Sequence, residues 1–197
     1  SDRAATIVAR SPDPGNWTAG DILYKGVRDG AAARAAHDYL RTHRGGQVAA
    51  DLIILSLDLA SRTLVISRNG PPVLLLEPEG GRVLDEACEA IGLRPGTKPV
   101  IVEVPVREGL RAVAFSDGVL EAGQRHGEAM IAEEWLALAA GWGPLPAQEL
   151  ADRLLARSLE LDRGRPEDDT SIVVVGVYPD GESDGARRVA VRLPLES

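Results

Sequence analysis

The sequence predicts an α+β fold in which antiparallel sheets are covered by helices. Short apolar runs cluster within residues 52–76 and 101–115, and helical stretches follow at residues 128–140 and 147–161. Short turns separate the runs of a cluster, and short turns join antiparallel neighbours rather than parallel ones. Strand clusters that alternate with helix pairs favour sheets with helices on their faces.

The N-terminal part is expected to supply two short strands and one helix. Residues 5–9 are predicted to form an edge strand, and residues 22–24 a second strand. Residues 30–42 are rich in Ala, the residue with the highest helix propensity, and predict a helix.

The next three apolar runs are expected to pair in order as a meander. They lie at residues 52–57, 63–67 and 73–76. A turn at residues 58–62 separates the first two runs, and Asn69-Gly70, a strong hairpin signal, precedes the third.

Two strands and two helices lead into the last strand. Residues 101–106 and 110–115 are predicted strands. Helices are expected at residues 128–140 and 147–161; Leu residues in the second are spaced to form an apolar stripe. The β-branched run at residues 172–175 is expected to be a central strand.

Composition indicates one domain in a reducing compartment. The chain of 197 residues has a net charge of −8, which argues against nucleic acid as a partner. Cys88 is the only cysteine, so an internal disulfide and a Cys-based zinc site are excluded, as suits the cytoplasm. No apolar run approaches the roughly 18 residues of a membrane helix, and the N-terminus does not resemble a signal peptide.

Two acidic motifs carry the functional prediction. Asp117 follows the apolar run that ends at Phe115, and Gly118 is expected to let the backbone turn sharply there. Asp168 precedes the run at residues 172–175. If these strands are antiparallel neighbours, both carboxylates meet at one sheet edge, which suits Mg²⁺ or Mn²⁺. Taken alone, Asp-Gly after a strand is most often an ordinary turn, and Asp-Asp before a strand is often a solvated loop.

Together these motifs resemble a known family, the metal-dependent protein serine/threonine phosphatases (PPM) of the SpoIIE, RsbU and RsbX type. FSDGVLEA, from Phe115 to Ala122, resembles their F-S/T-D-G-V-x-E-A signature, and DDTSIVV, from Asp168 to Val174, their closing D-D-x-T/S-x-x-V motif. SRNGPPVLL, from Ser67, is similar to their N-x-G-x-P-P-x-L-L segment without its usual His. The early Gly20-Asp21 resembles their G-D pair.

The resemblance implies a four-layer α-β-β-α sandwich of two mainly antiparallel sheets flanked by helices. It covers residues 20–177, so residues 1–178 are expected to form the phosphatase domain. Residues 179–197 would then be a tail, with alternating residues that predict one extra strand at 189–193.

The resemblance also implies a site for two ions, Mn²⁺ or Mg²⁺. Asp117 and Asp168 would hold one ion, and Asp21 and the backbone carbonyl of Gly26 the second. Gly118 and Asp169 would not contact the ions but would orient the residues that do. Arg28 is the nearest candidate in sequence for contacting the substrate phosphate, and a solvated surface role explains it equally well.

One departure from the family pattern bears on catalysis. Lys25 occupies the place of the Asp that would bridge the two ions, and the strand expected before Gly26 is missing. Either a segment that belongs between Lys25 and Gly26 is absent from the sequence, or the protein is degenerate. We favour the first, because loss of a central strand would leave an unpaired sheet edge.

The implied reaction is hydrolysis of phosphoserine or phosphothreonine on a bacterial signalling protein by metal-activated water. An anti-sigma-factor antagonist or a stress-signalling scaffold is the implied substrate, with no nucleic-acid or membrane partner. The alternatives are a pseudophosphatase that binds a partner without turnover, which Lys25 favours, and a hydrolase of small phosphoesters, which would need a closed pocket.

Overall fold

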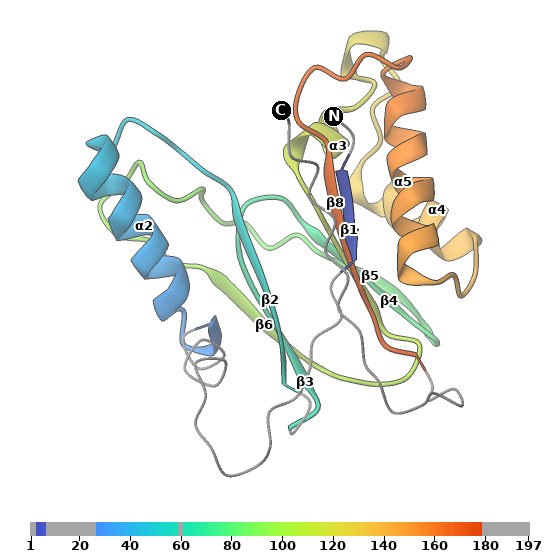
Figure 1. Cartoon of the computed structure of the whole chain (residues 1–197), viewed down its shortest axis with the longest axis horizontal. Coiled ribbons are helices and arrows are strands. Elements are labelled where there is room, and N and C mark those ends of the chain that lie inside the picture. The colour runs from blue at the N-terminus through green and yellow to red at the C-terminus, as the bar shows by residue number, and fades with distance from the viewer. Residues whose placement is uncertain (1–2, 7–26, 59–60, 179–197) are drawn as a thin grey trace, which may run out of the picture. The chain divides into compact units, whose positions relative to one another are not determined.

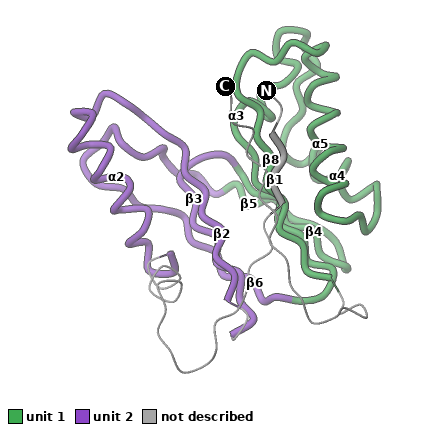
Figure 2. The backbone as a smooth tube through the Cα atoms, viewed as in Figure 1, with its two compact units in different colours: residues 1–9, 72–85, 107–197 green, residues 10–71, 86–106 purple. Residues whose placement is uncertain are grey.

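The computed structural model describes residues 3–6, 27–58 and 61–178. They belong to two compact units, and each unit contains one sheet (Figures 1 and 2). The described residues of the first unit are 3–6, 72–85 and 107–178, and those of the second are 27–58, 61–71 and 86–106.

The first unit has a five-stranded sheet in the order β1-β8-β7-β4-β5. Its strands are β1 (Arg3–Thr6), β4 (Val73–Glu77), β5 (Gly80–Leu84), β7 (Arg111–Phe115) and β8 (Ser171–Gly176). All neighbours pair antiparallel except β1 and β8, which are parallel. The predicted edge strand at the N-terminus is confirmed as β1, which begins earlier than expected.

Helices cover one face of this sheet (Figure 1). They are α3 (Asp117–Glu121), the 3-10 helix η1 (Gln124–His126), α4 (Ala132–Gly141) and α5 (Ala147–Leu161). Trp135 of α4 and Leu150 and Leu154 of α5 are fully buried in one cluster with alternate residues of β7, Val113 and Phe115. Alternation with period two is the pattern of a strand that presents one face to a helical layer.

The second unit has the three-stranded sheet β2-β3-β6 and one described long helix. Its elements are α2 (Ala31–Arg44), β2 (Leu52–Asp58), β3 (Thr63–Asn69) and β6 (Val100–Pro105). Helix α2 is anchored within this unit by buried His37, whose Nδ1 accepts a hydrogen bond from the Gly92 N–H at 3.1 Å.

The predicted α+β class, with two mainly antiparallel sheets and helices, is confirmed. Within the described residues, no helix combines the length and apolar character needed to cross a membrane. The predicted strands at residues 22–24 and 189–193 lie outside the part of the chain that the structure describes.

The predicted meander is wrong. β3 pairs with β2 and β6, whereas β4 pairs with β5 and β7, so the chain passes from one sheet to the other at residues 70–72. Pro71 and Pro72 have no N–H to donate, so this segment cannot continue a hairpin ladder. Asn69 instead directs its side-chain amide to the Glu89 carbonyl and the Thr97 hydroxyl, both at 2.9 Å.

Three local features differ from prediction. β5 was not predicted because it begins with Gly80-Gly81; a Cβ on Gly81 would lie 2.8 Å from Cδ1 of Leu136 in α4. The first helix after α3 begins at Ala132 rather than residue 128, because η1 and two positive-φ glycines, Gly123 and Gly127, precede it. Gly118 does not form a sharp turn but lies inside α3.

Candidate metal centre

The pairing of β7 with β8 brings both acidic motifs to the same edge of the five-stranded sheet. The two strands are antiparallel neighbours, with Phe115 opposite Ile172. The ladder continues one step further, where the Ser116 N–H donates to the Ser171 carbonyl at 3.0 Å. Asp117 and Asp168 therefore leave the sheet at the same end, which confirms the strand arrangement on which the sequence prediction depended.

The Ser116 side chain joins the two motifs directly. Its hydroxyl donates to the Asp169 carbonyl at 2.7 Å and accepts the Ser171 N–H at 3.0 Å. Sequence reasoning noted Ser116 only as part of a signature and gave it no role. The sequence feature that could have indicated this role is the position of Ser116 directly before Asp117. Once β7 and β8 pair, a hydroxyl at this position lies beside the residues that lead into β8.

Gly118 permits the close approach of the second motif. A Cβ at this position would lie 2.8 Å from the Asp169 carbonyl oxygen and 3.4 Å from that of Asp168. Real Cβ atoms essentially never approach backbone oxygen at 2.8 Å. The absence of a side chain at Gly118 thus allows the backbone of Asp168 and Asp169 to lie close to α3.

Both predicted carboxylates are exposed and held in the same way. Oδ1 of Asp117 accepts the Gly118 N–H at 2.9 Å, and Oδ1 of Asp168 accepts the Asp169 N–H at 2.7 Å. No described residue donates to Oδ2 of either side chain, so each has an oxygen available to solvent. Oxygen donors of this kind are the ligands that Mg²⁺ and Mn²⁺ prefer.

These residues fit one part of a divalent-cation site. The described residues contain no group of three or more His, Cys, Asp or Glu side chains arranged to hold a metal ion. The other predicted ligands, Asp21 and the Gly26 carbonyl, lie outside the described residues, as does Lys25.

The weak phosphate-binding candidate, Arg28, is engaged elsewhere in the structure. It forms a bidentate ion pair with Glu103, with Nε to Oε1 at 2.7 Å and the second nitrogen to Oε2 at 2.9 Å. This pair uses Nε and one terminal nitrogen of the guanidinium.

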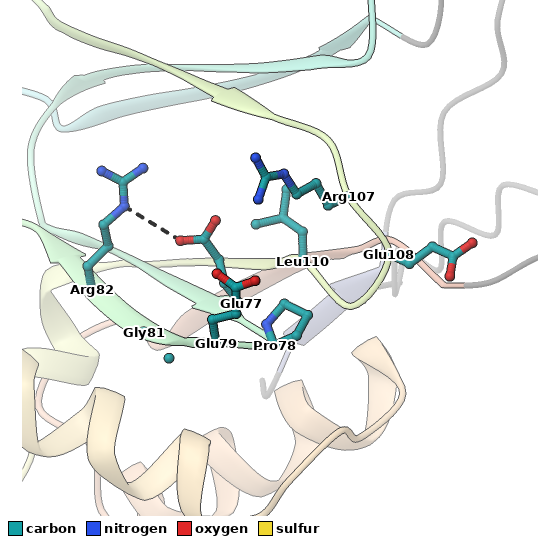
Figure 3. Close-up of a pocket in the computed structure, with 9 residues that line it drawn as sticks. Glu77, Pro78, Glu79, Gly81, Arg82, Arg107, Glu108 and Leu110 are labelled. Atoms are coloured by element: carbon teal, nitrogen blue, oxygen red, sulfur yellow. Dashed lines mark ion pairs between the residues drawn. The ribbon is translucent and has the colours of Figure 1, made fainter.

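A cavity of about 320 Å³ lies at the other end of the sheet (Figure 3). Leu110, which lines it, precedes the first residue of β7, whereas Asp117 follows the last. Arg107 and Glu108 line it too, and Arg82 pairs with Glu77 there, with Nε to Oε2 at 3.8 Å. The acidic pair is therefore not part of this cavity: it lies beyond the opposite ends of β7 and β8, which are inner strands of the sheet.

Comparison with known proteins gives one family and several solved structures. The sequence profile described as Stage II sporulation protein E (SpoIIE) matches residues 20–178. A comparison with curated protein sequences gave no match.

Three solved structures illustrate the similarity. The phosphatase domain of SpoIIE from Bacillus subtilis, presoaked with Mn, is 17% identical with a TM-score of 0.60, covering 87% of this chain and 79% of that one. The serine/threonine phosphatase PstP/Ppp of Mycobacterium tuberculosis is 14% identical with a TM-score of 0.59, covering 81% and 82%. The RsbU and RsbW domains of Rv1364c from Mycobacterium tuberculosis are 26% identical with a TM-score of 0.53, covering 79% and 46%. The fold is thus that of bacterial PP2C phosphatase domains.

Proposed function

Since the chain belongs to the SpoIIE family, we propose that it is a metal-dependent phosphatase that hydrolyses phosphoserine or phosphothreonine on a protein. The observation that carries the proposal is the shared sheet edge of Asp117 and Asp168, fixed by the β7–β8 register and by the Ser116 hydroxyl.

Asp117 and Asp168 would hold one Mn²⁺ or Mg²⁺ ion, through the carboxylate oxygens that the neighbouring N–H groups leave available. Asp21 and the Gly26 carbonyl would hold a second ion, as the family resemblance implies. Bound ions supply Lewis-acid chemistry, which makes water nucleophilic near neutral pH and stabilises charge on the phosphoryl oxygens.

Residues next to the two carboxylates fix the direction in which the carboxylate oxygens point. Gly118 and Asp169 donate the N–H groups that fix the direction of the two carboxylates. Water would attack the phosphorus as the bond from phosphorus to the serine or threonine oxygen breaks. The attacking water gives up a proton to solvent and the departing oxygen takes one from solvent, so no covalent intermediate forms on the protein.

A protein is the substrate class that the site favours. The two carboxylates are exposed at a sheet edge, and the cavity described above lies at the opposite end of β7. A phosphorylated side chain on a folded partner can reach exposed carboxylates, whereas an enclosed pocket is the kind of site that favours a small phosphoester. We propose a bacterial anti-sigma-factor antagonist or stress-signalling scaffold as partner, in the cytoplasm, on the strength of the resemblance.

The test is hydrolysis of a phosphoserine peptide and of an aryl phosphate with Mn²⁺, Mg²⁺ or chelator. We expect metal-dependent turnover of the peptide that Asp117→Asn removes. Asp152→Asn is the matched control, because Asp152 is an exposed α5 residue whose carboxylate accepts a local hydrogen bond from Gln148, one turn earlier in the same helix. No turnover by folded wild-type protein with either metal would reject the enzyme and favour the partner-binding alternative that Lys25 suggests.

A further inference from the structure

A second junction joins the segments that carry the two acidic motifs, away from Ser116. Residues 123–128 follow α3 and residues 162–167 follow α5, and Figure 1 shows α3 and the last turn of α5 at the same end of β8. Three contacts connect the segments: the Gly123 N–H donates to Oδ1 of Asp162 at 2.8 Å, Arg125 pairs with Glu167, and Arg163 pairs with Glu128 at 3.6 Å.

The Asp162–Gly123 hydrogen bond dominates this junction. It is partly buried, its acceptor is charged, and Gly123 itself is buried. The two ion pairs have side chains between 43% and 69% exposed, and ion pairs exposed to water contribute little to stability.

Asp162 is itself rigidly placed. It is the C-terminal cap of α5, directly after buried Leu161. The chain beyond it closes a Schellman motif, in which the Arg163 N–H donates to the Glu160 carbonyl at 2.9 Å and the Gly164 N–H to the Leu159 carbonyl at 2.7 Å. The backbone of Asp162 is therefore held at the end of α5, and its carboxylate accepts the Gly123 N–H from that position.

The junction completes the attachment of both metal-binding segments. Ser116 joins them where they leave the sheet, before Asp117 and after Asp168. Gly123 and Asp162 join them beyond the acidic residues on the other side. Each carboxylate thus lies on a segment held at both ends, which lowers the conformational entropy lost when a ligand is bound.

We propose that Asp162 is a positioning residue for the metal centre: its hydrogen bond to Gly123 sets the spacing of Asp117 and Asp168 before an ion binds. The proposal rests on the proposed function, since it assumes that these two carboxylates bind the ion.

The experiment is an Mn²⁺ titration of the folded protein, with free Mn²⁺ followed by electron paramagnetic resonance. Asp162→Ala is expected to weaken Mn²⁺ binding about tenfold, the lower end of the range for residues that orient metal ligands. Asp162→Asn keeps the acceptor oxygen and removes the charge, so its dissociation constant should stay within about twofold of wild type. Asp162→Glu keeps the charge but displaces the acceptor, and should weaken binding several-fold.

Two controls separate the explanations. Asp152→Ala removes one exposed carboxylate from the same helix and should leave Mn²⁺ binding unchanged. Unfolding temperatures measured in chelator report any general loss of stability in each Asp162 variant. Recovery of Mn²⁺ binding by Asp162→Asn would show that the acceptor oxygen matters and the charge does not. The donor side offers no clean variant, because Gly123 has φ +83° and its Cβ would meet the Glu128 backbone.

The outcomes are distinct for the two proposals. If wild type binds Mn²⁺, Asp117→Asn loses at least one bound ion, and both Asp162→Ala and Asp162→Glu bind as wild type, the positioning role is rejected and the phosphatase proposal stands. Equal weakening by Asp162→Ala and Asp162→Asn also rejects it, since charge alone would then be responsible. If wild type binds no Mn²⁺, the proposed function fails and the positioning role falls with it.

Discussion

Ser116 is the residue whose contribution can be isolated most directly. Its hydroxyl makes two hydrogen bonds between the ends of β7 and β8, to the Asp169 carbonyl and from the Ser171 N–H. Ser116→Ala should lower the free energy of unfolding by about 1–2 kcal/mol, and should weaken Mn²⁺ binding. Ser116→Thr retains the hydroxyl and should recover most of both losses in urea unfolding and metal titration. Equal behaviour of the two variants would contradict the assigned hydroxyl role.

Gly118 makes a second prediction at the same scale. Gly118→Ala places a Cβ against the Asp169 carbonyl, and backbone cannot yield as a flexible side chain can. We expect a loss of about 1–3 kcal/mol in unfolding free energy, together with reduced phosphatase activity. Gly141→Ala is the matched control: Gly141 ends α4 with nothing within 4 Å of its Cβ position, so stability should be unchanged or slightly higher.

Tyr178 predicts how the stability of the folded protein changes at alkaline pH. Burial raises the pKa of its phenol above 10.0, while Arg111 and a backbone hydrogen bond from Ala147 act to lower it. The raised pKa means that the folded protein keeps this proton when the unfolded chain has lost it. Its contribution is therefore complete below pH 10 and is lost as pH rises through the folded-state pKa. The urea midpoint should fall less between pH 9 and pH 11 in Tyr178→Phe than in wild type; an equal fall would contradict this account.

At the scale of elements, the end of α5 contains a correctable strain. Arg163 occupies the left-handed position of the Schellman motif with φ 52°, where glycine is favoured. Arg163→Gly should raise the unfolding free energy by about 0.5–1 kcal/mol, since its ion pair with Glu128 is exposed. Arg157→Gly, inside α5, should instead lower it by about 1 kcal/mol. Destabilisation by Arg163→Gly in thermal and urea unfolding would show that the ion pair outweighs the strain.

Helices and strands with a clear apolar period or a β-branched run were predictable from the sequence. Those that depend on close packing between segments distant in sequence were not. Helix α5 was predicted with its observed bounds, and β8 within a residue at each end, because their apolar patterns are clear. β5 was missed because it begins with two glycines, of which Gly81 is needed for the close packing of Leu136, a contact that the sequence does not show. The Asn69-Gly70 signal misled because Pro71 and Pro72 favour a crossing between sheets over a hairpin.

At the scale of the whole molecule, pairs of distant segments decide the candidate site. The sequence alone singled out Asp117 and Asp168 as candidate metal ligands from their positions at strand ends. That prediction required the two strands to be antiparallel neighbours, and the pairing of β7 with β8 meets this condition. Ser116 and Asp162 escaped prediction because their partners, Asp169 and Gly123, lie far away in sequence. Hydrogen bonds of this kind become visible only when the strand register and the helix ends are known.

The measurement that tests the central claim most directly is the anomalous scattering of Mn²⁺ in crystals of the protein soaked with that ion. We predict a peak within coordination distance of carboxylate oxygens from both Asp117 and Asp168, absent from crystals of Asp117→Asn. A peak elsewhere, or none at an Mn²⁺ concentration that saturates binding in solution, would show that these carboxylates do not form the metal centre.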